Sequence, residues 1–143
     1  MLRYLVPSVF ILIVMACASG PQPIKIGKEA CAFCKMTISD SRFGAELITN
    51  KGKIFVFDDP SCLVSFLHDS QNKINKSEIK ASYLTDFIVP HNLILAENAY
   101  IIKSESISAP MNGTWVAFSN KDSAESFLIK QTGKFEKWND VIQ

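Results

Sequence analysis

The stretch Asn50-Lys-Gly-Lys-Ile-Phe-Val-Phe-Asp-Asp-Pro-Ser-Cys-Leu-Val-Ser-Phe-Leu67 decides the fold that we expect for this chain. Its first three residues are a turn signal, and the run Lys53–Phe57 that follows, apolar after its first residue, is typical of a β-strand. Asp59 then suits the N-cap of a helix, and Pro60 suits its first turn, where a missing N–H costs nothing. The stretch therefore predicts turn, strand and helix in direct succession, with the helix ending near Asp69.

The segments on either side extend this pattern. Phe43–Thr49 alternates as a strand does, so it forms a hairpin with the strand at Lys53–Phe57. Further extended segments are expected at Tyr83–Val89, Ala99–Lys103 and Thr114–Phe118. The last of these follows Asn112-Gly113, a dipeptide typical of tight hairpin turns. A second helix is expected from Lys121 to about Lys130, capped by Asn120 and ended at Gly133, with a short packing element around Trp138.

These elements contain an internal sequence repeat. An offset of 61 residues places Gly52 on Gly113 and Phe57 on Phe118, and turn, strand, cap and helix recur in the same order. Self-similarity at a fixed offset indicates a repeated unit. We therefore expect an α+β fold of two pseudo-repeated ββα(β) units packed together, one over residues 29–75 and the other over residues 76–143.

The amino terminus resembles a lipoprotein signal. A basic start and an apolar run too short to span a bilayer make residues 1–16 a signal peptide. The run ends at Ala16-Cys17, which resembles a bacterial lipobox, so Cys17 is the expected site of lipid attachment. Residues 17–28 are small, polar and Pro-rich and are expected to form a tether. The mature chain is then exported and anchored to a membrane facing the periplasm, with the outer membrane slightly favoured.

Charge and cysteine content restrict the function further. The formal net charge is +1 and no basic stripe is present, which argues against a nucleic-acid partner. The sequence contains neither a catalytic triad nor a phosphate-binding loop, so we do not expect an enzyme. Besides Cys17 the chain has three cysteines, Cys31, Cys34 and Cys62. This odd number in an exported chain argues against a purely structural disulfide framework.

The motif Cys31-Ala-Phe-Cys34-Lys-Met36 carries the chemistry. Thiolate and thioether sulfur are soft donors that favour Cu(I) over hard cations. The same CxxC pair suits a thiol–disulfide couple or half of a zinc site. A zinc site normally needs a second ligand pair, and a thioredoxin-like couple normally follows a strand and opens a helix. Neither context is found here, although a redox protein and a soft-metal scavenger or sensor remain alternatives.

Two further sulfur-containing residues have open roles. Met111 lies beside a turn, where it is either a gap-filling apolar side chain or a metal ligand. Cys62 is expected on the first turn of the first helix, where a buried thiol is the simpler interpretation and an additional metal ligand is the alternative.

Together, the lipobox Cys17, the CxxCxM motif, the strand end Phe57-Asp58-Asp59 and Pro110-Met111 before a glycine resemble the NosL family. These lipoproteins are associated with nitrous oxide reductase and implicated as Cu(I) chaperones. The resemblance implies two ββαβ-like units and makes Met111 a copper ligand. The chain departs from the family at Lys35 and Asn112, where the family usually has glycine. Lys35 also places a cation beside the thiols, which should favour deprotonation of Cys31 and Cys34.

We therefore predict a membrane-anchored Cu(I) metallochaperone. Its metal ligands are Cys31, Cys34, Met36 and Met111, with Cys62 as a candidate additional ligand. It delivers copper to an exported copper enzyme, nitrous oxide reductase by the resemblance, or to the transporter complex that matures it.

Overall fold

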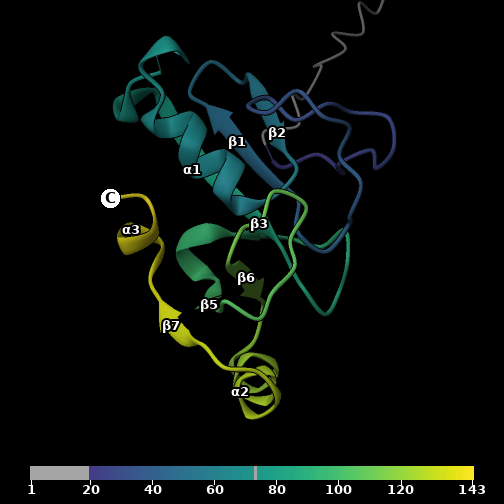
Figure 1. Ribbon diagram of the computed structural model, residues 1–143. Helices are drawn as coiled ribbons and strands as arrows, with labels where there is room; N and C mark the ends of the chain where they lie inside the picture. Colours follow the sequence, from purple (N-terminus) through teal and green to yellow (C-terminus); the bar gives the residue numbers. More distant parts are fainter. Residues whose placement is uncertain (1–19, 73) are drawn as a thin grey trace, which may run out of the picture.

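The computed structural model describes residues 20–72 and 74–143, which fold into two antiparallel sheets with helices at both ends of the molecule (Figure 1). The strands are β1 (Ala45–Thr49), β2 (Ile54–Phe57), β3 (Ile79–Thr85), β4 (Leu93–Leu95), β5 (Tyr100–Lys103), β6 (Trp115–Phe118) and β7 (Lys134–Glu136). The helices are α1 (Pro60–His68), α2 (Lys121–Lys130) and α3 (Trp138–Val141), with short 3-10 turns at Ser70–Asn72, Lys76–Glu78 and Ala96–Asn98. The α+β class predicted from the sequence is confirmed.

The first sheet has the strand order β2-β1-β3-β4, so β2 is an edge strand. β1 lies in the middle and is buried along its whole length. Its register with β2 sets Ala45 opposite Phe57 and Ile48 opposite Ile54, as expected for a hairpin closed by the turn at Gly52. Gly52 has a φ of 78°, a left-handed conformation that glycine adopts without steric cost.

Helix α1 begins where the sequence predicts. Asp59 is the N-cap, with its Oδ1 accepting a hydrogen bond from the N–H of Cys62 at 3.0 Å, and Pro60 occupies the first turn. The helix packs on the first sheet through Phe66, whose ring centroid lies 5.0 Å from that of Phe55 and 5.1 Å from that of Phe57. Strand and helix are thus joined by only two residues, which fixes where the first turn of α1 lies relative to the end of β2.

The second sheet has the order β6-β5-β7, and α2 packs against it. Asp86 links the two sheets: it forms a parallel bridge with Ala117, and its carboxylate accepts a hydrogen bond from the N–H of Ser119 at 3.1 Å. Because Asp86 is 1% exposed, this carboxylate is part of the interior and not of the surface.

The two sheets correspond in topology, since in each the first strand lies between the second and the third. Asn120 caps α2 through the N–H of Ser123 at 2.8 Å, as Asp59 caps α1 through Cys62. This correspondence in topology does not test the repeat in the sequence, and the pseudo-repeat stays a prediction.

Four expectations differ from the structure. The extended segment expected at Tyr83–Val89 is β3, which spans Ile79–Thr85 and ends before the turn that follows Asp86. The first sheet includes β3 and β4, so the sheets divide between residues 95 and 100 and not at residue 75, because β3 pairs with β1 over long range. Ile24 is 8% exposed and joins the core, so packing begins inside the segment assigned to the tether. β5 and β6 are joined by residues 104–114, so Asn112-Gly113 does not form a two-residue hairpin turn.

The predicted signal peptide and Cys17 lie outside the described residues. Among the residues that the structure describes, none of the helices is both long enough and apolar enough to cross a bilayer.

Candidate metal site

Cys31 and Cys34 lie on a tight loop that precedes the first sheet. The N–H of Cys31 donates to the carbonyl of Met36 at 2.8 Å, and the N–H of Lys35 donates to the carbonyl of Cys31 at 3.1 Å. Outside this loop, Ala30 and Thr37 form an antiparallel bridge. The loop is attached to the edge of the first sheet, because the N–H of Ala32 donates to the carbonyl of Val56 in β2 at 2.8 Å.

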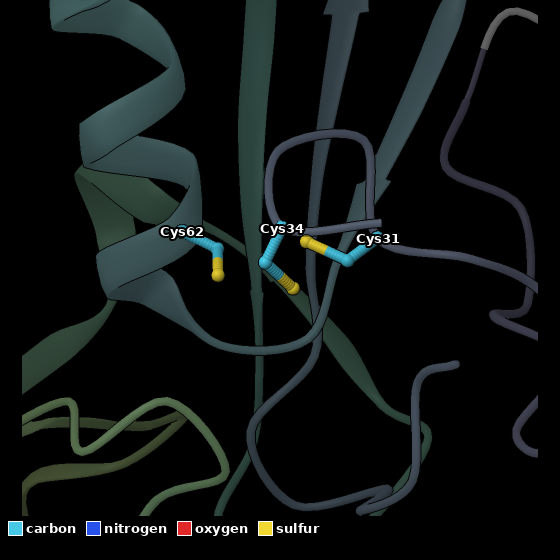
Figure 2. Close-up of side chains that lie close together, drawn as sticks. All are labelled: Cys31, Cys34 and Cys62. Carbon is cyan, nitrogen blue, oxygen red and sulfur yellow. The ribbon is translucent and has the colours of Figure 1, made fainter. Parts of the chain in front are cut away.

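The third cysteine reaches the loop from α1. The sulfur atoms of Cys31, Cys34 and Cys62 all lie within 4.8 Å of one another. Figure 2 shows their side chains converging, with Cys62 on the first turn of α1 and the other two on the loop. Cys31 and Cys62 are buried, at 1% and 2% exposed, whereas Cys34 is partly exposed, and all three are free thiols. One thiol of the cluster is therefore accessible from outside while two are enclosed.

The three thiols are not equivalent in acidity. A hydrogen bond from the Cys62 thiol is the largest cause that lowers the pKa of Cys31, to about 5, helped by the N–H of Asp58. The same hydrogen bond raises the pKa of Cys62, and burial raises it further. Burial also raises the pKa of Cys34. Cys31 is therefore the most acidic thiol of the cluster.

This result corrects the expectation for Lys35. We expected its cation to favour deprotonation of both loop cysteines, but the pKa of Cys34 rises. The ammonium of Lys35 instead donates to the carbonyl of Ala32. The thiolate character of Cys31 comes from Cys62 and backbone N–H groups.

Met111 approaches the cluster through a shared carboxylate. The N–H of Met111 donates to Oδ2 of Asp59 at 3.1 Å, while Oδ1 of the same carboxylate accepts from the N–H of Cys62. The side chain of Met111 is partly buried and packs against the hydrophobic core that includes Cys31 and Cys62. Asp59 thus holds together two segments that are far apart in the sequence and that both carry a sulfur-containing side chain.

The loop that carries Met111 lies very close to α1. A Cβ atom added to Gly113 would lie 2.7 Å from Oδ2 of Asp59 and would also clash with Oγ of Ser61. Glycine at this position is therefore needed for the close approach of the two segments and not for an unusual φ.

Met36 is placed differently. Its backbone closes the loop opposite Cys31, but its side chain is 56% exposed. The structure therefore brings the backbone of Met36 to the cysteines and leaves its thioether at the surface of the loop.

Comparison with known proteins identifies the family of this chain. The family model NosL matches residues 23–143, which is most of the chain. The chain belongs to the NosL family. It is also similar to a solved structure described as the crystal structure of the copper chaperone NosL from Shewanella denitrificans, at 26% sequence identity with a TM-score of 0.73. That match covers 87% of this chain and 97% of the other. Among curated proteins no sequence matches this one.

The backbone is left-handed at both positions where the resemblance led us to expect glycine. Lys35 has a φ of 66° and Asn112 a φ of 54°, both in the left-handed region that glycine occupies freely. Asparagine tolerates this region, whereas lysine pays a steric cost there. Both residues therefore occupy a backbone conformation that glycine adopts more easily.

Asp59 and Cys62 have larger roles in the structure than the sequence predicts. Asp59 was identified as a helix cap, and its second hydrogen bond, to Met111, could not be inferred from local sequence. Cys62 was treated as a candidate additional ligand, and the structure places its sulfur within the cluster. The sequence places Cys62 on the first turn of the first helix, but nothing local to it indicates that this turn faces the cysteine loop.

Proposed function

We propose that the chain binds Cu(I) through cysteine and methionine sulfur and carries it to a recipient protein. As a member of the NosL family it is a carrier and not an enzyme. The observation that supports copper most strongly is the convergence of three cysteine sulfurs within 4.8 Å. Cu(I) favours two or three soft donors at low coordination number, and three clustered thiols meet that preference.

The donor set that we propose contains Cys31, Cys34 and Cys62, with Met111 and Met36 as thioether donors. Met111 is suited to complete the site from the buried side, because Asp59 fixes its backbone to the start of α1. Met36 is suited to the transfer of copper, because a thioether exposed on the loop is able to meet incoming copper or to pass it on. A thioether is never protonated, so its donor capacity does not depend on pH.

The partial exposure of Cys34 supports transfer of copper and not permanent storage. A carrier must release its ion, and ligand exchange needs at least one donor that a partner's ligand can approach. Cys34 provides this access while Cys31 and Cys62 stay enclosed. Attachment of Cys17 to a lipid would confine the exchange to a membrane surface facing the periplasm. The recipient that we propose is nitrous oxide reductase or the transporter complex that matures it.

An anaerobic Cu(I) titration against a competing chelator tests the copper proposal. The full chain is compared with Cys31→Ser, Cys34→Ser, Cys62→Ser, Met36→Ala and Met111→Ala. We expect each cysteine variant and Met111→Ala to bind Cu(I) more weakly, and X-ray absorption of the loaded protein to show sulfur neighbours. Neighbours that are only nitrogen and oxygen, or no loading under reducing conditions, would contradict the proposal.

One observation favours a second function, thiol–disulfide exchange. Cys31 combines a pKa lowered to about 5 with a neighbouring thiol, as a redox couple requires. The same variants separate the two functions. If Met111→Ala and Met36→Ala leave Cu(I) affinity unchanged while Cys31→Ser abolishes a measurable reductase activity, the redox function is the correct one.

A further inference from the structure

A groove beside the cysteine loop has the character of a docking site. It has a volume of about 580 Å³ and is lined by Ala32 and Lys35 of the loop and by Lys51 and Lys53 of the β1–β2 hairpin. Further along the chain, Phe66, Gln71, Asn72, Ile74 and Glu78 line it. Because Ala32 and Lys35 flank Cys34 on the same loop, a molecule in the groove would contact the segment that holds two of the three thiols.

The rim of the groove is positively charged. Lys35, Lys51 and Lys53 are exposed, and none of them takes part in an ion pair within the described part of the chain. Glu78 is the acidic residue in the lining, and its carboxylate accepts from the N–H of its neighbour Asn75 at 3.1 Å. Three cations thus face one carboxylate that is already engaged, and the groove is complementary to negative charge.

The floor of the groove is apolar. Phe55, Phe66 and Ile74 line it, and the rings of Phe55 and Phe66 pack at 5.0 Å. The ammonium of Lys53 lies 4.5 Å from the centroid of the Phe55 ring, so a cation stands directly beside apolar surface. A ligand that fits this combination carries acidic groups around an apolar side chain.

We propose that this groove binds an acidic segment with an apolar anchor on the protein that exchanges copper with this chain. The inference rests on the proposed function, because it makes the groove the contact that brings the partner's ligands to Cys34. Charge complementarity would speed the encounter, and the apolar floor would hold the segment in register with the loop. A peptide is favoured over an anionic membrane because the lysines border a hollow of about 580 Å³ with an apolar lining, which suits an inserted side chain.

The test uses the full chain in detergent and a fluorescein-labelled peptide in which glutamates surround one phenylalanine. Binding is followed by fluorescence anisotropy at low and high salt. The groove variant is Lys51→Glu with Lys53→Glu, and the matched control is Lys130→Glu with Lys137→Glu, which makes the same charge change at exposed sites outside the groove. We expect the groove variant to bind the peptide about tenfold more weakly, and the control to bind it like the unchanged chain.

Two further measurements keep the result specific. Ile74→Ala should weaken binding of the phenylalanine peptide and leave binding of an all-glutamate peptide unchanged. Equal losses in the groove and control variants would overturn the proposal, as would displacement of the peptide by short-chain phosphatidylglycerol together with tighter binding of that lipid. Cu(I) affinity is measured on the same proteins. Failure of copper binding in the unchanged chain would defeat the proposed function, whereas loss of peptide discrimination with copper binding intact would defeat the groove alone.

Discussion

The buried carboxylate of Glu46 makes the stability of this protein depend on pH. Glu46 lies in β1, the middle of the first sheet, and its side chain is 0% exposed. Burial is the largest cause that raises its pKa, to about 7, opposed by the N–H of Gln22 and increased by the charge of Glu29. The N–H of Gln22 lies 3.2 Å from both carboxylate oxygens.

The sign and size of the effect follow from this shift. In the unfolded chain the pKa of glutamate is near 4.5, so between pH 4.5 and about 7 the folded protein binds more protons than the unfolded one. The contribution of Glu46 to stability is therefore fully present below pH 4.5 and is lost as the pH rises through this window. At about 1.4 kcal/mol per pKa unit, the full loss attributable to Glu46 is about 3 kcal/mol.

Glu46→Gln isolates this contribution. Glutamine keeps the shape and an acceptor for the Gln22 N–H but cannot ionise, so the variant lacks this part of the pH dependence. We expect the unfolding free energies of the two proteins to differ by a constant amount below pH 4.5. Above pH 7 the variant should have gained about 3 kcal/mol relative to the unchanged chain.

Urea unfolding of the metal-free protein at pH 4, 6 and 8 measures the difference. Other titrating groups, the cysteines included, are common to both proteins and cancel in the comparison. Glu29→Gln is the control for charge: since burial dominates, it should keep most of the pH dependence. Parallel stability curves for Glu46→Gln and the unchanged chain from pH 4 to pH 8 would refute the reasoning.

Three further substitutions test the geometry of the metal site. Lys35→Gly should stabilise the protein by about 1 kcal/mol in urea unfolding, because glycine adopts the left-handed conformation of this position without steric cost. The control Lys51→Gly, where φ is not positive, should not stabilise it. Asp59→Asn should lower the free energy of unfolding by about 1–3 kcal/mol, because the amide has one oxygen and cannot accept at both positions from Cys62 and Met111. It should also weaken Cu(I) binding. The control Asp69→Asn, at the partly exposed other end of α1, should lower the free energy of unfolding less. Gly113→Ala should lower the free energy of unfolding by about 1–3 kcal/mol and should lower Cu(I) affinity. Its control is Gly20→Ala, where an added Cβ meets no atom within 4 Å. An unchanged Cu(I) affinity in Gly113→Ala would argue against Met111 as a ligand.

The elements that the sequence predicts well are those with local causes. α1 begins after Asp59 and α2 spans Lys121–Lys130, because in both a capping side chain satisfies an N–H three residues ahead. β4 and β7 were missed because each is three residues long and is held by its partner strand and not by an apolar pattern of its own. The tight turn expected at Asn112-Gly113 was wrong because the dipeptide packs on α1 within a longer loop.

In the candidate site, too, the sequence predicts what has a local cause and misses what depends on packing. The CxxCxM motif identifies the soft donors because their chemistry depends on residue type. No local rule places Cys62 beside Cys31, since the two are brought together by the packing of α1 on the first sheet. The double role of Asp59 is likewise invisible in sequence, because a cap is defined by neighbours along the chain and Met111 is 52 residues away.

One strand explains how the three thiols meet. β2 is an edge strand, and its free side accepts a hydrogen bond from Ala32, which fixes the loop of Cys31 and Cys34. Its end leads within two residues into α1, which fixes Cys62 on the first helical turn. The cluster therefore depends on the register of β2 against β1, and a shift of one residue would move the loop and the helix together. Backbone pairing therefore preorganises the three thiols, whose positions follow from the strand and not from a ligand.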